Sequence, residues 1–213
     1  MSIDFIQKAS FVFWDFDGVI KDSVEAKSDA FEQLFIPFGK DIAKKVRIHH
    51  EENGGMSRFD KLPIYLDWAE QPSSVQLITE YAENFSLLVK QKVVDSPWVD
   101  GVLDYLHNNH KKQQFFLITA TPQHEIEDIL SQLKIAKCFE QVIGYPTGKT
   151  EAIKFLLKGY NIDSKKAIMV GDSSSDYDAA MQNQLTFILR KTELNKKLQK
   201  QPIYLKIINF MEV

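Results

Sequence analysis

Four short segments of this 213-residue sequence each end just before polar side chains that could do chemistry. Three of the segments are apolar runs, and the fourth is rich in turn residues. The segments, each with the polar residues that follow it, are 11–14 (Asp15, Asp17), 115–118 (Thr119), 143–148 (Lys149) and 167–170 (Asp172, Asp176). If the segments end at one edge of a sheet, they bring carboxylates, a hydroxyl and an ammonium group together.

Such a cluster could bind a cation and handle a phosphoryl group. Crowded carboxylates repel one another unless a cation neutralises them, and hard oxygen ligands suit Mg²⁺. A carboxylate such as Asp15 can attack phosphorus, and Asp17 lies near enough in sequence to protonate a leaving oxygen. Thr119 and Lys149 are suitable donors to the equatorial oxygens of a transferring phosphoryl group. These residue types therefore predict metal-assisted phosphoryl transfer.

The elements that must position these residues resemble a parallel sheet. Short continuous apolar runs bounded by turn signals are typical of strands buried on both faces. Strands alternating with helices indicate βαβ units, and ligands bind outside the carboxyl ends of such strands. We expect an α/β fold with a Rossmann-like three-layer core and a mostly parallel sheet. The other expected core elements are helices at 101–110, 121–133 (with Thr121 as N-cap and Pro122 as first residue) and 150–158, and an edge strand at 203–208.

The stretch after the first acidic pair reads as helix without a clear strand. Apolar residues recur at helical spacing over residues 26–38, 58–69 and 73–92, and the second of these is interrupted or begins near Pro63. Residues 49–55 read as a polar loop. The sequence thus predicts a core domain, residues 1–20 and 96–213, that holds an inserted α-helical cap domain, residues 21–95.

Composition excludes several other classes of protein. With 44% hydrophobic and 26% charged residues, the chain is neither disordered nor fibrous. A formal net charge of −3 argues against a general nucleic-acid binder. No apolar stretch approaches the length of a membrane span, and the single cysteine, Cys138, cannot form an intrachain disulfide. We expect a cytoplasmic monomer or homodimer that binds neither nucleic acid nor membranes.

The order of the motifs resembles the haloacid dehalogenase (HAD) superfamily, which consists mainly of Mg²⁺-dependent phosphatases. The motifs are Asp-x-Asp-Gly-Val from Asp15, then Thr119, then Lys149, then Gly-Asp-x-x-x-Asp from Gly171, and the resemblance covers nearly the whole chain. The helical insertion after the first motif is similar to the cap of the phosphoglycolate phosphatase and β-phosphoglucomutase branch. Their ordered combination is far more specific than any one motif alone.

The resemblance implies a role for each matching residue. Asp15 would be the nucleophile and Asp17 the general acid and base. Thr119, Lys149 and the backbone amide of Ala120 would hold the phosphoryl group.

The resemblance also implies a magnesium site. Asp172 would ligate Mg²⁺ together with Asp15 and the backbone carbonyl of Asp17. Asp176 would support the metal site or its waters.

In the inserted helices, Arg58 is a candidate for contact with an anionic part of the substrate. Gly55 to Arg58 resembles a Gly-x-Ser-Arg segment in the cap of some β-phosphoglucomutase relatives, and a guanidinium suits phosphate or carboxylate. The alternative is that Ser57 caps the second helix and Arg58 is exposed in its first turn. Glu125, near the start of a core helix, is expected to be solvated.

Two functions remain open. The first is a phosphatase that hydrolyses a small phosphate ester, such as a sugar phosphate or a phosphoglycolate-like compound, through an aspartyl phosphate. The alternative is a phosphomutase, an isomerase acting on sugar phosphates. Lys27 stands where mutase relatives typically have a histidine, which favours hydrolysis. Asp17 disfavours a dehalogenase or a phosphonatase, and the helical insertion disfavours a receiver-type signalling domain.

Overall fold

The computed structural model describes residues 2–211, and six strands in this part of the chain form one parallel sheet. The strands are β1 (Phe11–Trp14), β2 (Gln114–Pro122), β3 (Gln141–Tyr145), β4 (Ala167–Gly171), β5 (Thr186–Arg190) and β6 (Leu205–Ile207). Their order is β3-β2-β1-β4-β5-β6, and every neighbouring pair is parallel. The predicted α/β fold, its mostly parallel sheet and the strand near residues 203–208 are confirmed.

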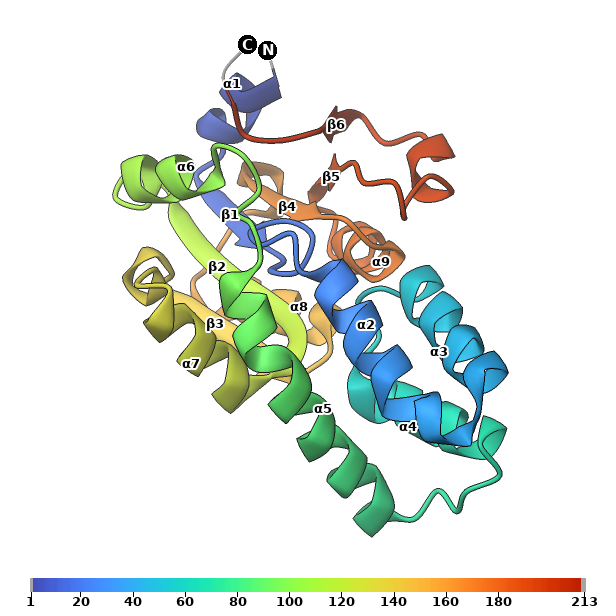
Figure 1. Cartoon of the computed structure of the whole chain (residues 1–213). Coiled ribbons are helices and arrows are strands. Elements are labelled where there is room, and N and C mark those ends of the chain that lie inside the picture. The colour runs from blue at the N-terminus through green and yellow to red at the C-terminus, as the bar shows by residue number, and fades with distance from the viewer. Residues whose placement is uncertain (1, 212–213) are drawn as a thin grey trace.

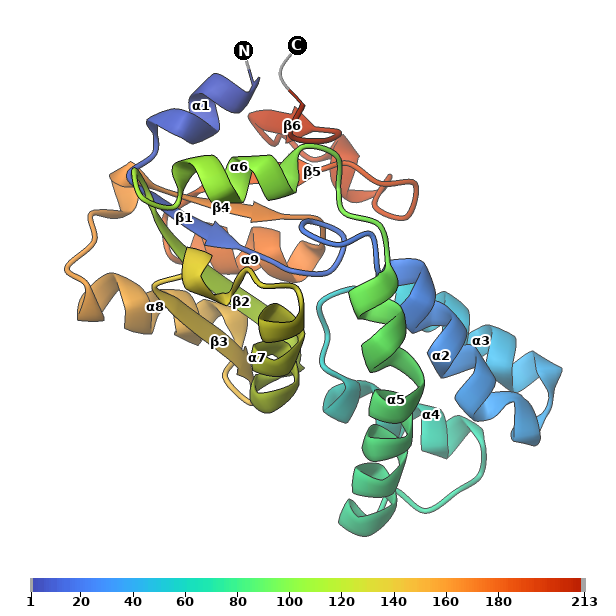
Figure 2. The same ribbon diagram turned by 60° about the vertical axis from the view of Figure 1, so that its left-hand side comes forward.

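Helices cover both faces of the sheet, so the core has three layers (Figure 2). They are α1 (Ser2–Lys8), α6 (Val102–Asn109), α7 (Gln123–Gln132), α8 (Lys149–Gly159) and α9 (Ser174–Gln182). Successive side chains of a strand point to opposite faces. Val12 and Trp14 of β1 pack in the same cluster as side chains of α1, α6 and α7, whereas Phe13 packs with side chains of α8 and α9. This double burial explains why the strands read as unbroken apolar runs.

Four more helices follow β1 in the chain and lie beside the end of the sheet (Figure 1). They are α2 (Val24–Phe35), α3 (Lys40–Glu52), α4 (Arg58–Trp68) and α5 (Val75–Asp95), and we refer to them as the inserted helices. Aromatic side chains hold them together, with ring centroids 4.0 Å apart for Phe31 and Phe85 and 5.4 Å apart for Phe31 and Tyr65. No helix within residues 2–211 has the length and apolar character that crossing a membrane requires. The division into core and cap domains at residues 20/21 and 95/96 stays a prediction.

The prediction of a polar loop over residues 49–55 is largely wrong. Residues 49–52 form the last turn of α3, and the loop begins only at Asn53. The buried side of α3 consists of Ala43, Val46 and His50, which recur at helical spacing. Because the third of these is a histidine, an apolar pattern does not reveal the helix.

Two prolines also differ from their predicted places. Pro63 does not interrupt or start α4, which runs continuously from Arg58 with Ser57 as its N-cap. The N-terminus of α7 was predicted at Thr121 and Pro122, but β2 extends through both residues and α7 begins at Gln123. Proline fixes φ at a value that suits a strand end as well as a helix start, so the residue type alone does not decide between them.

The two chain segments that join the inserted helices to the core pair with each other. The Asp22 amide donates to the Pro97 carbonyl (2.9 Å) and the Val99 amide to the Ile20 carbonyl (3.1 Å). Lys21 is buried beside this pairing, where its ammonium donates to the Val94 carbonyl (3.0 Å). These bonds fix where the inserted helices leave and rejoin the sheet.

The loop between α3 and α4 touches the loop that follows β4. Gly55 has φ of +82°, and a Cβ there would lie 2.1 Å from Ser175 Oγ and 2.7 Å from Ser173 Oγ. Only glycine fits this conformation and this approach without strain. The inserted helices therefore rest directly on the carboxyl edge of the sheet.

Gly55→Ala is expected to push the two loops apart. Amide hydrogen exchange at residues 53–57 and 173–176 should become faster, because the added methyl group overlaps Ser175. Gly39→Ala is the matched control, since Gly39 also has positive φ (+107°) but meets no atom within 4 Å. It should change exchange only around its own turn, and unchanged exchange in Gly55→Ala would contradict the close contact.

Candidate active site

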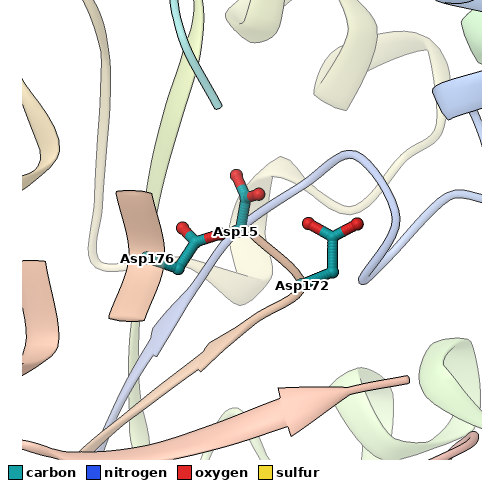
Figure 3. Close-up of side chains that lie close together, drawn as sticks. All are labelled: Asp15, Asp172 and Asp176. Atoms are coloured by element: carbon teal, nitrogen blue, oxygen red, sulfur yellow. The ribbon is translucent and has the colours of Figure 1, made fainter. Parts of the chain in front are cut away.

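Three aspartates meet at the carboxyl edge of the sheet (Figure 3). Asp15 follows β1, Asp172 follows the neighbouring strand β4, and Asp176 lies in the first turn of α9. One carboxylate oxygen of each lies within 4.8 Å of the others. The pairing of β1 with β4 is what brings together two acids that are far apart in sequence.

One cation of the chain partly offsets this negative charge. Lys149, the first residue of α8, places its ammonium 3.0 Å from Asp15 and 2.6 Å from Asp176. Burial by itself would lower the pKa of Lys149, but the two carboxylates outweigh burial and raise it. Asp176 also accepts hydrogen bonds from the Ser173 amide (3.1 Å) and hydroxyl (2.5 Å). The bond from the amide is one half of a capping box for α9, in which the Ser173 side chain in turn accepts from the Asp176 backbone amide. Protein donors thus already surround the Asp176 carboxylate.

The charges of Asp15 and Asp172 are less well compensated. Burial, and then the nearby charge of Asp176, raise the pKa of Asp15 to about 7. Burial and the charge of Asp15 raise the pKa of Asp172 well above its ordinary value. Paired carboxylate oxygens with an excess of negative charge fit a hard divalent cation, which would favour their ionised forms. Asp15 and Asp172 are therefore the side chains that could hold a metal.

Asp17 is turned away from this group toward the inserted helices. It forms an ion pair with Lys27 of α2 and accepts a hydrogen bond from Ser23 (2.6 Å). Burial would raise the pKa of Asp17, but Lys27 and Ser23 outweigh burial and lower it. Lys27 also donates to the Thr121 hydroxyl of β2 (3.0 Å), so one ammonium connects an inserted helix to two core segments. The carboxylate of Asp17 thus lies outside the group of carboxylates that could hold a metal.

A cavity of about 530 Å³ lies between the sheet edge and the inserted helices. Its volume is within the range of pockets for small molecules. Of the residues predicted from sequence, all but Asp176 line it: Asp15, Asp17, Arg58, Thr119, Ala120, Lys149 and Asp172. The inserted helices add Lys27, His50 and Lys61 to the wall. The structure thus gathers the predicted residues around one space, although their individual roles stay predictions.

Arg58 occupies a place that the sequence did not predict. Ser57 caps α4 by accepting from the Asp60 amide (3.2 Å), as expected, but Arg58 is buried and not exposed in the first turn. Its guanidinium donates two hydrogen bonds to Glu125 of α7, at 2.7 and 3.0 Å. The expectation that Glu125 is exposed to solvent is therefore wrong. Its carboxylate is buried, where Arg58 neutralises its charge and the Ser86 hydroxyl donates a hydrogen bond to it (2.7 Å).

Sequence reasoning did not predict the roles of several side chains that line the site or pair with residues that line it. Lys61 could have been found, because it lies one helical turn after Arg58 and so faces a similar direction. The position of Lys27 was noted because mutase relatives have a histidine there, but its ion pair with Asp17 was not predicted, since the packing of α2 on the sheet edge decides it. Glu125 had no local signal, because its partner lies 67 positions earlier in the chain.

Comparison with known proteins supports the motif assignment. The family model described as haloacid dehalogenase-like hydrolase matches residues 12–189. The chain belongs to this family. A phosphoglycolate phosphatase of Pseudomonas fluorescens is 26% identical over 182 residues, which are 79% of this chain and 64% of that protein. The chain thus spans less than two thirds of that curated relative.

Solved structures of the family share the fold. A β-phosphoglucomutase from Clostridium difficile has a TM-score of 0.75 at 20% identity, covering 95% of this chain and 92% of that one. A haloacid dehalogenase-like family hydrolase from Streptococcus pneumoniae has a TM-score of 0.69 at 18% identity, covering 93% and 94%. At these identities the likeness shows the fold alone. The shared fold includes the inserted helices, because the two structures cover 95% and 93% of this chain.

Mg²⁺ is expected to raise the melting temperature, and more at pH 8 than at pH 5. Without metal, raised pKa values of Asp15 and Asp172 mean that stability falls as pH rises from 3.8 toward 7, because the folded protein retains protons that the unfolded chain releases. Metal binding must displace these protons at pH 5 but less so at pH 8. At 100 times its Kd, a ligand stabilises by about 2.7 kcal/mol.

Asp172→Asn is the companion variant for this measurement. It should melt higher than the unsubstituted protein at pH 8 without metal, because one repelling charge is gone, and should lose the Mg²⁺ shift. An equal Mg²⁺ shift at the two pH values, or a full shift in Asp172→Asn, would contradict a metal site at these carboxylates.

Glu125→Gln is expected to reduce the free energy of unfolding by about 3–5 kcal/mol, because it leaves the Arg58 guanidinium buried and uncompensated. The pair lowers the pKa of Glu125, so its stabilising effect is complete above pH 4.5 and shrinks as pH falls. Asp128→Asn is the control, since it breaks the exposed ion pair between Lys90 and Asp128 on α5 and α7 and should change little. Equal effects of the two variants in urea unfolding would contradict the importance of the buried pair.

Proposed function

We propose that the protein is a Mg²⁺-dependent phosphatase that hydrolyses small phosphate esters through an aspartyl phosphate on Asp15. The observation that carries the proposal is the position of Asp15, which lines the cavity with its carboxylate 3.0 Å from the Lys149 ammonium and within 4.8 Å of an Asp172 oxygen. Family membership supports phosphoryl chemistry there. The name of the Pseudomonas fluorescens relative points to a small phosphorylated acid as one substrate to try.

Several of the chain's own residues would hold the reacting group. An Asp15 oxygen attacks phosphorus, a new O–P bond forms, and the bond to the leaving oxygen breaks. Lys149, the Thr119 hydroxyl and the Ala120 amide donate to the phosphoryl oxygens, whose charge grows in the transition state. A divalent cation, held by Asp15 and Asp172, would supply further positive charge beside these oxygens.

Asp17 is the residue proposed to move the protons. It must be protonated to give a proton to the leaving oxygen, and a phosphate dianion bound beside it favours that form. After the leaving group departs, the Asp17 carboxylate takes a proton from the water that attacks the aspartyl phosphate. The ion pair with Lys27 stabilises the carboxylate form, which is the form that this second step requires.

The inserted helices are proposed to act as a cap over the site. Their loop meets Ser175 at Gly55, Lys197 pairs with Glu52 (2.9 Å), and Arg58 pairs with Glu125. A closed cap excludes bulk water from the reacting group and strengthens its electrostatic contacts. A cytoplasmic location and a monomeric or homodimeric state stay predictions.

The purified protein is expected to release phosphate from p-nitrophenyl phosphate when Mg²⁺ is present. The release should stop when EDTA removes the metal. Asp15→Asn should lower the rate roughly 10³-fold or more, because the amide is a poor nucleophile. Asp178→Asn, the same substitution at an exposed position of α9, is the control and should keep full activity. An equally active Asp15→Asn protein would refute the proposal. Conversion of β-glucose 1-phosphate to glucose 6-phosphate without free phosphate would favour a phosphomutase instead.

A further inference from the structure

A segment outside the sequence motifs forms part of the cavity wall. It spans residues 191–204, connects β5 to β6, and we refer to it as the β5–β6 segment. Because it follows a parallel strand, it starts at the same edge of the sheet as the three aspartates. Its residues Thr192, Leu194 and Asn195 line the cavity, and its Lys197 pairs with Glu52 of α3. The segment thus contacts both the cavity and the inserted helices.

The side chain of Asn195 uses all of its hydrogen-bonding capacity. Its Nδ2 donates to the backbone carbonyls of Asp172 and Arg190, both at 2.8 Å. Its Oδ1 accepts from the Thr192 amide (2.9 Å) and from the Gln199 side chain (2.8 Å). A carboxamide offers two N–H donors and an oxygen with two lone pairs, so none of these is left over. The oxygen closes a turn within the segment, whereas the nitrogen joins the segment to the ends of β4 and β5.

The bond to Asp172 connects the β5–β6 segment to the candidate metal site. Asp172 lies 23 positions before Asn195 and follows β4, the strand that pairs with β5. The Asp172 carboxylate lies against Gly18, where a Cβ would come within 2.1 Å of Asp172 Oδ2. Asn195 therefore holds the backbone of Asp172, while the glycine leaves room for its carboxylate.

A metal ligand in a loop binds its ion more tightly when its backbone is already fixed. Fixing a residue costs conformational entropy, and a hydrogen bond that forms before the ion arrives removes that cost from binding. Asp172 needs such a brace, because the charge of Asp15, with an oxygen within 4.8 Å, repels its carboxylate when no cation is present. Loss of a group that orients a metal ligand typically weakens metal binding about 10- to 100-fold.

We propose that Asn195 is a positioning residue for the metal site, because its bond to the Asp172 carbonyl holds the Asp172 carboxylate where a divalent cation needs it. This inference rests on the proposed Mg²⁺-dependent function and adds to it a residue from outside the motifs. Coupling between two events is reciprocal, so a bound cation must in turn strengthen the hold of Asp172 on the β5–β6 segment. Binding of the cation and order in this part of the cavity wall are therefore linked.

Calorimetric titration with Mg²⁺ tests the proposal directly. Asn195→Ala should raise the Kd for Mg²⁺ about 10- to 100-fold, because the backbone of Asp172 must then be ordered when the ion binds. Gln199→Ala is the matched control, since Gln199 braces the same turn through the Thr192 carbonyl (2.7 Å) and Asn195 Oδ1. It leaves the bond to Asp172 in place and should change the Kd less than about threefold. An unchanged Kd in Asn195→Ala, or an equal rise in both variants, would overturn the proposal.

Amide hydrogen exchange measures the reciprocal effect. Mg²⁺ should slow exchange over residues 192–199 in the unsubstituted protein and in Gln199→Ala, but not in Asn195→Ala. Equal slowing by Mg²⁺ in all three proteins would show that this bond does not couple the segment to the cation, and the proposal would be wrong. If Asn195→Ala does not fold, Asn195→Ser takes its place, because its hydroxyl can accept from the Thr192 amide but is too short to reach the Asp172 carbonyl.

Kinetics separate the positioning role from the proposed function. With p-nitrophenyl phosphate, Asn195→Ala should need about 10- to 100-fold more Mg²⁺ for its half-maximal rate, and its kcat at saturating Mg²⁺ should stay within about threefold of the unsubstituted value. A kcat that saturating Mg²⁺ does not restore would contradict a role through the cation.

The two proposals can fail independently. If Asn195→Ala weakens Mg²⁺ binding but the unsubstituted protein hydrolyses no ester, the phosphatase proposal fails and the positioning role stands. If the ester is hydrolysed and both proteins bind Mg²⁺ with one Kd, the positioning role is refuted and the phosphatase function stands. If the unsubstituted protein binds no Mg²⁺, both proposals fail.

Discussion

Repulsion among buried carboxylates is the constraint on which the rest of this structure depends. Parallel pairing of β1 with β4 places Asp15 and Asp172 side by side, and α9 adds Asp176. In water such charges would be screened, but Asp15 and Asp176 are buried and Asp172 is half-buried, so their charges are costly. Lys149 reduces this repulsion, because its ammonium forms ion pairs with Asp176 and with one oxygen of Asp15. What remains is a local excess of negative charge that suits a divalent cation, although the whole chain carries a formal net charge of only −3.

The inserted helices bring the complementary charge to the same cavity. Lys27 neutralises Asp17, and Lys61 adds a second ammonium that no described carboxylate pairs with. The contact of Arg58 with Glu125 has a different effect. It joins α4 to α7, and the Glu125 carboxylate neutralises the charge of the guanidinium. Two cations one helical turn apart on α4 thus have different surroundings, because Arg58 pairs with a carboxylate of α7 and Lys61 contacts His50.

The parts of the fold that followed from the sequence are those with a strong local signal. Strands β1, β2 and β4 were predicted because strands covered on both faces need unbroken apolar runs, whereas β3 and β5 were not predicted as strands. The helix α3 was missed because His50 takes an apolar position in its buried side. The start of α7 was misplaced because Thr121 and Pro122 suit a strand end as well as a helix cap. In each of these two cases the residue type allowed both answers, and packing against other elements chose between them.

The sequence by itself determined which functional side chains are available at the sheet edge and in which order they occur along the chain. Asp15 directly follows the apolar run of β1, and Asp172 directly follows Gly171, the last residue of β4, so the ends of two strands place these carboxylates. Thr119 also follows an apolar run, but β2 continues past it to Pro122. Only the tertiary structure decided the partners across the cavity: Lys27 with Asp17, Arg58 with Glu125, and Lys61 with His50. The physical reason is that an ion pair depends on distances of a few ångströms between separate elements, and no local pattern of residues encodes those distances.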